Sequence, residues 1–315
     1  MIALIFFSLC FRLLLLQSPA DIVDTPLGGY TDIVPYREGF VAVGSGGRCH
    51  QLSATGALQK AISLPDLQFV GATAVNNAVV AAAETGQMVQ LRPDGTVARI
   101  DELAGKSLHC LVWFNRKVIA GSNSGQLYVG SENDNFESVR LAVKGDIIAL
   151  SANARSCYGV TNQGEVIYSD NGTTWKIFDF NRVYKGYYKP GRFTAVLVSE
   201  KGIAIAGMND EGLPVFYHSA KGQVWTETRL LYTDENGASQ TLRATPNDIY
   251  YDGVNQSYYL ACQEGSLMIL PSCMQCNQLL RFPATSLSAI SGNSEAVLVA
   301  GHNDYLQSFT PISLN

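Results

Sequence analysis

Tyr168-Ser169-Asp170-Asn171-Gly172-Thr173-Thr174-Trp175 decides the fold: it is a polar turn that opens into a strand led by tryptophan. Its glycine can adopt backbone angles that other residues resist, as a tight turn requires. A strand at residues 165–169 precedes the turn and itself follows a turn glycine, Gly164. The stretch therefore predicts two short antiparallel strands joined by a tight turn.

The same signature of a small apolar run, a polar turn and another strand recurs along the chain. The turns lie at Gly47, Gly86, Gly125, Gly164, Gly212, Gly265 and Asp304, and subtracting neighbours gives spacings of 39, 39, 39, 48, 53 and 39 residues. A period of about 40 residues with four short strands per unit is typical of a β-propeller blade. The sequence therefore predicts an all-β fold, a seven-bladed β-propeller of four-stranded antiparallel blades.

The fourth repeat shows the expected strands of one blade, at residues 146–152, 157–160, 165–169 and 173–179. The last repeat supplies strands at 286–292, 296–301 and 305–310, and the chain ends before a fourth. Residues 21–27 lie before the first repeat without a partner. We expect them to form the outer strand of the seventh blade, which would close the ring and remove a sheet edge.

Residues 1–20 form the only long apolar run, and Ser18-Pro19-Ala20 offers the small residues of a cleavage site. We expect a signal peptide, so that residues 21–315 form the propeller in the periplasm, outside the cell or on its surface. Arg12 interrupts the run and no Lys or Arg precedes it. A retained membrane anchor is therefore the alternative, and membrane contact is expected only in that case.

Charge argues against one class of partner. Without Arg12 the chain has 21 basic and 27 acidic residues, a net charge of about −6. No basic stripe supplies the phosphate contacts that nucleic acid binding needs. We expect a monomer without nucleic acid partners.

Six cysteines remain after residue 20, an even number that favours disulfides in an exported protein. Cys273 and Cys276 lie 8 and 11 residues past Gly265, the offsets of Gly172 and Trp175 from Gly164. A local disulfide that clamps this turn is expected. Redox chemistry and zinc are less favoured, because no second Cys-x-x-Cys or spaced His pair exists. We expect no cofactor or metal. The remaining cysteines allow three pairings among Cys49, Cys110, Cys157 and Cys262.

Candidate binding residues lie where the repeat is interrupted, at residues 180–193 and 232–246, which flank the fifth blade on one face. Long loops on a rigid scaffold commonly bind partners. The first insertion offers Arg182, Tyr184, Lys185, Tyr187, Tyr188, Lys189 and Arg192, and the second offers Asp234, Glu235, Asn236 and Arg243. Tyrosine and arginine are enriched at interfaces. The alternative is that the tyrosines only pack the loops onto blade five.

The opening stretch resembles the Asp-box, Ser-x-Asp-x-Gly-x-Thr-Trp, in which only Tyr168 departs from the pattern. The resemblance implies that Asp170 bonds the turn backbone, that Gly172 and Thr174 shape the turn, and that Trp175 packs between sheets. Degenerate boxes lie at residues 131–136 and 221–225. The turns are interpreted as structural elements.

The chain resembles Asp-box or BNR-repeat propellers, both the photosystem II assembly-factor-like ones that act as docking platforms and the sialidase superfamily. A sialidase implies six blades, an early Tyr/Phe-Arg-Ile-Pro and three arginines. Here Glu38-Gly39 follows Tyr36-Arg37, which departs from that motif. Arg37, Arg192 and Arg243 could supply the three arginines, but they are scattered along the chain and no motif selects them. We therefore expect a non-catalytic exported propeller that binds a protein or glycan through the blade four to six face. The alternatives are a sialidase-like carbohydrate hydrolase and a purely structural surface protein.

Overall fold

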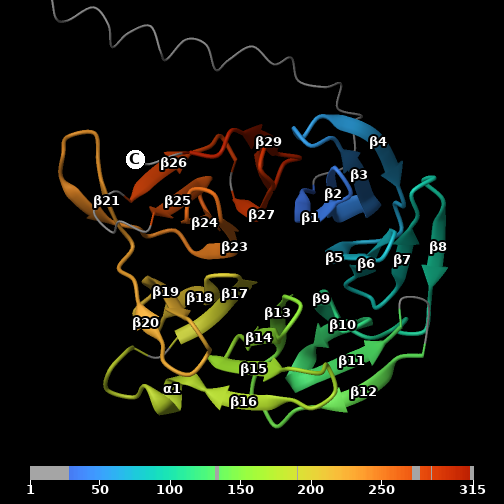
Figure 1. Ribbon diagram of the computed structural model, residues 1–315, viewed down its shortest axis with the longest axis horizontal. Helices are drawn as coiled ribbons and strands as arrows, with labels where there is room; N and C mark the ends of the chain where they lie inside the picture. Colours follow the sequence, from blue (N-terminus) through green and yellow to red (C-terminus); the bar gives the residue numbers. More distant parts are fainter. Residues whose placement is uncertain (1–27, 132–134, 190, 272–276, 285, 313–315) are drawn as a thin grey trace, which may run out of the picture.

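The computed structural model describes residues 28–131, 135–189, 191–271, 277–284 and 286–312. Antiparallel sheets are arranged radially in a ring, with the first strand of each innermost and the last outermost (Figure 1). Six blades have four strands and the seventh has three within these residues. The prediction of a seven-bladed all-β propeller is confirmed.

Blades one to four follow the 39-residue period closely. Blade one comprises β1 (Tyr30–Tyr36), β2 (Gly39–Gly44), β3 (Arg48–Leu52) and β4 (Leu58–Ser63). Blade two comprises β5 (Phe69–Val75), β6 (Ala78–Ala83), β7 (Met88–Leu91) and β8 (Val97–Ile100). Blade three comprises β9 (Leu108–Phe114), β10 (Lys117–Ser122), β11 (Gln126–Gly130) and β12 (Glu137–Arg140). Blade four comprises β13 (Ile147–Ala152), β14 (Cys157–Thr161), β15 (Glu165–Ser169) and β16 (Lys176–Asp179).

Blades five to seven carry the insertions. Blade five comprises β17 (Gly191–Ser199), β18 (Gly202–Asn209), β19 (Pro214–Ser219) and β20 (Thr226–Glu227). Blade six comprises β23 (Pro246–Asp252), β24 (Ser257–Cys262), β25 (Ser266–Pro271) and β26 (Gln278–Arg281). Blade seven comprises β27 (Leu287–Gly292), β28 (Val297–Gly301) and β29 (Leu306–Phe309). The other elements are η1 (Ser45–Gly47), η2 (Asn123–Gly125), α1 (Phe180–Val183), β21 (Leu231–Thr233) and β22 (Ser239–Thr241).

The core lies between the blades, because each sheet is covered by a neighbour on both faces. Strands β6 and β28 are therefore buried at every position and consist of alanine, valine, leucine and glycine. Small and β-branched side chains suit strands packed on two sides near a crowded axis. Outer strands such as β4 are largely exposed.

Contacts between blades seven and one close the ring within the described residues. The backbone of Gly29 bridges that of His302, and the Asp304 N–H donates to the Gly28 carbonyl at 3.2 Å. The Arg48 guanidinium forms a largely buried ion pair with Asp304. The predicted closing strand at residues 21–27 lies outside the described residues.

The turn at residues 168–175 is held by other side chains than the Asp-box pattern implies. The Asn171 carboxamide oxygen accepts from the N–H groups of Thr173 and Thr174 at 2.9 and 2.8 Å, while Asp170 is exposed. Ser169 Oγ accepts from the Gly172 N–H at 2.8 Å. Gly172 has the expected positive φ of 74°, and the partly buried Trp175 packs on the core between blades three and four. Asn171 and Ser169 take the role expected of Asp170, because their side chains are the ones that reach the turn N–H groups.

The cysteines differ from the expected disulfide framework. Cys49, Cys110, Cys157 and Cys262 are buried free thiols, so none of the three pairings forms. Burial raises the pKa of Cys110 and Cys262 to about 12, which keeps these thiols protonated. Cys273 and Cys276 lie outside the described residues. Within the described ranges, no helix is long and apolar enough to cross a membrane.

Candidate binding surface

The first insertion begins with a short helix that is fastened at both ends. The Asp179 carboxylate caps α1 by accepting from the Arg182 N–H at 3.0 Å. The Asn181 carboxamide donates to the Gly191 carbonyl at 2.9 Å and accepts from the Gly191 N–H at 2.8 Å. One side chain therefore joins the start of the insertion to the first residue of blade five.

Two tyrosines clamp the insertion to blade five through Trp225. The Tyr184 hydroxyl accepts from the Trp225 N–H at 2.9 Å, and the Tyr188 hydroxyl donates to the Trp225 carbonyl at 3.0 Å. Their rings surround Phe180, which is 1% exposed, and Trp225 is 2% exposed. The alternative that the tyrosines pack the loop therefore describes Tyr184 and Tyr188.

Tyr187 has the opposite environment, since 84% of it is exposed. Val183 is 49% exposed, and Arg182 and Lys185 are exposed beside it in sequence. We define this set, Arg182, Val183, Lys185 and Tyr187, as the tyrosine patch. The patch presents an aromatic ring and two cations on a segment whose neighbours are anchored.

The remaining basic residues of the first insertion lie closer to blade five. The Lys189 ammonium is 2.8 Å from the Glu211 carboxylate, and this hydrogen-bonded pair raises the lysine pKa. Both side chains are exposed, so the pair contributes little stability. Arg192 is an exposed residue of β17.

The second insertion forms a hairpin, β21 with β22, in place of the expected loop. The Asp234 carboxylate accepts from the Ala238 N–H at 2.8 Å, from the Gln240 carboxamide at 3.0 Å and from the Asn236 N–H at 3.0 Å, and these bonds lower its pKa. Asp234 therefore stabilises the hairpin turn. The tip residues Glu235 and Asn236 are exposed, as is Arg243.

The two insertions do not meet in one surface. Figure 1 shows α1 beside β16 of blade four and the hairpin beside β26 of blade six. The Asn277 carboxamide also donates to the Leu231 carbonyl at 2.9 Å, joining the hairpin to blade six. The candidate residues therefore form two patches on opposite sides of blade five.

A central cavity of about 210 Å³ lies among the innermost strands. Each of these strands carries a register irregularity near its start. The irregularities lie at Thr31, Val70, His109, Ile148, Thr194, Asn247 and Ser288, and all seven residues line the cavity. Four of the five polar ones bond the next blade: Thr31 Oγ1, for example, donates to the Phe69 carbonyl at 2.9 Å, and Asn247 Nδ2 to the Leu287 carbonyl at 2.7 Å, whereas His109 bonds Asn123 of its own blade. These four polar bulges therefore tie neighbouring blades together.

Two aspartates that the sequence analysis did not single out line the same cavity. Asp32 accepts from the N–H groups of Ile33 and Ala72, and Asp248 from those of Ile249 and Ile290, all at 2.8 Å. Burial raises the pKa of Asp32 to about 6 and that of Asp248 to about 7, against the lowering effect of these bonds. The neighbouring Asp32 charge contributes to the shift of Asp248. The sequence does carry a signal for this pair. Asp32 and Asp248 are acidic at a repeat position where the other blades have a small or uncharged residue, namely Gly71, Cys110, Ala149, Ala195 and Ala289.

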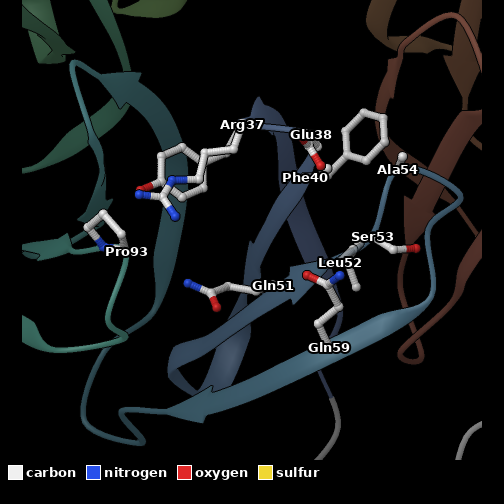
Figure 2. A pocket seen from close by; sticks show the side chains of 11 residues that line it. Arg37, Glu38, Phe40, Gln51, Leu52, Ser53, Ala54, Gln59 and Pro93 are labelled. Carbon is white, nitrogen blue, oxygen red and sulfur yellow. The ribbon is translucent and has the colours of Figure 1, made fainter.

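A second cavity, of about 640 Å³, lies at blade one beside blade two and was also missed (Figure 2). Arg37 lines it, while Arg192 and Arg243 line neither cavity, so the arginine triad of the sialidase alternative does not assemble around either space. Among the described residues, no three His, Cys, Asp or Glu side chains gather as metal ligands.

No protein-family model matches the chain, and no curated protein sequence matches it. Solved structures do match. The WD40 β-propeller domain of Doa1 has a TM-score of 0.68 and 11% identity over 90% of this chain and 93% of that chain. YCF48 bound to D1 peptide has a TM-score of 0.67 and 14% identity over 94% and 96%. The computationally designed Ika8 protein has a TM-score of 0.59 and 13% identity over 90% and 97%.

This chain has the β-propeller fold. Identities of 11–14% establish a shared fold alone. The expected resemblance to Asp-box or BNR repeats is not confirmed by these comparisons. The likeness to YCF48 agrees with the β-propeller architecture expected from the sequence.

Proposed function

We propose that this protein is a non-catalytic docking platform that binds a protein partner at the tyrosine patch. The observation that carries the proposal is the contrast between Tyr187, 84% exposed, and the hydroxyls of Tyr184 and Tyr188, bonded to Trp225. A loop that is already ordered loses little conformational freedom on binding. An exposed aromatic ring on such a loop has the properties of an interface anchor.

The charges around Tyr187 favour an acidic protein segment over a neutral glycan. Arg182 and Lys185 are both exposed and neither forms an ion pair within the described residues. Cationic side chains around an aromatic centre accelerate encounter with an anionic partner and fix its orientation. Support for a protein partner also comes from the fold, since YCF48 was solved bound to D1 peptide.

Export completes the proposal. Residues 1–20 direct the chain out of the cytoplasm, and residues 21–315 act as a monomeric propeller in the periplasm, outside the cell or on its surface. The apolar run and the small residues at Ser18-Pro19-Ala20 support it. Fractionation of cells that express the full chain tests export: recovery of residues 1–20 on a cytoplasmic protein would contradict it.

The docking proposal is tested by capture from an envelope fraction with the parent chain, Tyr187→Ala and Val254→Ala. Val254 is 79% exposed in the β23–β24 turn and serves as a matched surface control. We expect the parent and Val254→Ala to retain the same partner and Tyr187→Ala to lose it. Tyr184 and Tyr188 stay unchanged because their removal would disturb the loop itself. Equal capture by all three chains would show that Tyr187 is not the anchor.

A further inference from the structure

Aromatic rings fill two of the grooves between neighbouring blades. Trp175, at the start of the outer strand of blade four, packs on a core that includes Phe114 and Val129 of blade three. Trp225 of blade five packs in the same way with Tyr158 of blade four. An indole from the next blade therefore closes each of these grooves.

The groove between blades one and two contains the rings of Tyr36 and Phe69 but has no tryptophan at the matching position. Trp175 lies 11 residues past Gly164 (175 − 164), and the residue 11 past Gly86 in blade two is Val97. Val129 lies 4 residues past Gly125 (129 − 125), and the residue 4 past Gly47 in blade one is Gln51. Gln51 lines the cavity of about 640 Å³, as does Pro93 from the turn before Val97. Pro93 is the contribution of blade two to this cavity, and the other lining residues belong to blade one.

Polar side chains surround the cavity: Arg37, Glu38 and Gln59 are exposed, and Gln51 is half-buried. Figure 2 shows Arg37, Glu38, Gln51 and Gln59 around it. None of these four side chains has a hydrogen bond or ion pair to another described residue. Arg37 lies over the Tyr36 ring, 5.6 Å from guanidinium carbon to centroid. The Tyr36 hydroxyl is bonded to the Asn77 carbonyl at 2.6 Å, so the ring under the guanidinium is fixed.

The charges of this lining select a class of ligand. Arg37 and Glu38 cancel, so neither an anion nor a cation is favoured overall. An apolar ligand would remove water from the amides of Gln51 and Gln59 without replacing their hydrogen bonds, which costs free energy. A hydroxyl group both donates and accepts, and therefore matches a carboxamide, a guanidinium and a carboxylate together. Cavities of several hundred Å³ with a few convergent polar groups are typical of small-molecule sites.

We propose that the cavity at the β1–β2 and β3–β4 turns of blade one, which Pro93 of blade two borders, binds a neutral saccharide. The Gln51 and Gln59 carboxamides bond its hydroxyls, Arg37 donates to it from its place over the Tyr36 ring, and Pro93 packs against a ring face. The site is separate from the tyrosine patch, since it lies on blades one and two. Either proposal can fail without affecting the other.

The test is isothermal titration of the purified chain with maltotriose, cellotriose and chitotriose, beside glucose 6-phosphate as an anionic comparison. The variant Arg37→Asn/Gln51→Val gives blade one the residues that blade three has at Asn115 and Val129. Arg37 has a φ of 55° and Asn115 a φ of 50°, so asparagine suits the turn and the fold should be kept. The matched control is Gln223→Val, which removes an exposed amide in blade five.

We expect at least one neutral trisaccharide to bind with a Kd of about 1 mM or tighter. Affinity should fall at least about tenfold in Arg37→Asn/Gln51→Val, in keeping with the loss of one or two hydrogen bonds, and stay unchanged in Gln223→Val. The proposal is overturned if no neutral saccharide binds, if only the phosphorylated sugar binds, or if the double variant with an unchanged melting temperature binds as the parent does.

Discussion

The Tyr184 hydroxyl accepts a hydrogen bond at 2.9 Å from the backbone N–H of Trp225, a residue 41 positions later in the chain. The bond joins the connection after blade four to the outer strand of blade five. Tyr188 completes the clamp at the Trp225 carbonyl. An insertion that interrupts the repeat is thereby made part of the contact between blades, and Tyr187 is presented from a fixed base.

This clamp predicts a difference among tyrosines in one loop. Tyr184→Phe should lower the free energy of unfolding by about 1–2 kcal/mol, because it leaves the enclosed Trp225 N–H without its acceptor. Tyr187→Phe should change it by less than about 0.5 kcal/mol, since its ring and hydroxyl are exposed. Chemical denaturation of the two variants measures both values. Equal effects would show that the hydrogen bond to Trp225 contributes nothing.

The hydrogen bonds of the turn at residues 168–175 predict that Asn171 contributes more to stability than Asp170, the reverse of what the Asp-box pattern implies. Asn171→Ala should cost about 1–2 kcal/mol of stability, because it removes the acceptor for the N–H groups of Thr173 and Thr174. Asp170→Ala should stay within about 0.5 kcal/mol, as expected for an exposed side chain. Thermal unfolding of the two variants decides the matter, and a larger loss in Asp170→Ala would restore the Asp-box interpretation.

The ion pair between Arg48 and Asp304 at the ring closure predicts that the stability of the fold depends strongly on Arg48. Arg48→Ala should destabilise the protein by about 3–5 kcal/mol, because it leaves the enclosed Asp304 charge unpaired. Arg99→Ala is the control: it removes an exposed pair with Asp66 at 2.8 Å and should cost less than about 1 kcal/mol. Urea denaturation compares the two. Similar losses would mean that burial of the closing pair has no energetic consequence.

The central aspartates predict a stability that depends on pH. Their pKa values in the folded state, about 6 for Asp32 and about 7 for Asp248, lie above the ordinary 3.8. The folded state therefore binds these protons more tightly, and the stabilisation present below pH 3.8 is lost as pH rises through 6 and 7. His50 and His218, with lowered pKa values, act in the opposite direction.

Comparison with a variant separates these contributions. The unfolding free energy of the parent should fall relative to that of Asp248→Asn as pH rises from about 5 to about 8. Only the parent has the Asp248 carboxyl, which in the folded state loses its proton over this range. Denaturation at several pH values measures the difference. A difference that stays constant over this range would contradict a raised pKa at Asp248.

The sequence by itself determined the ring and its repeats. Turn glycines 39 residues apart and the apolar runs between them are local patterns, so they located the four strands of blade four to within a few residues. It also located both insertions and the Trp175 anchor. Backbone preference and burial near the axis act within each repeat, so the residues of one repeat are enough to predict its strands and turns.

The tertiary structure decided what depends on two blades at once. Only the packing of blade five shows that Tyr184 and Tyr188 anchor the loop while the Tyr187 side chain is exposed. The spacing predicted that the insertions flank blade five, but not that the second one forms a hairpin that packs on blade six. The carboxyl of Asp248 meets the N–H of Ile290, 42 residues away. The cavity beside Gln51 is completed by Pro93 of blade two, 42 residues later in the chain (93 − 51). Contacts between repeats depend on the shape and size of side chains that lie about 40 residues apart in the sequence. The residues of one repeat do not determine how those side chains pack against the next blade.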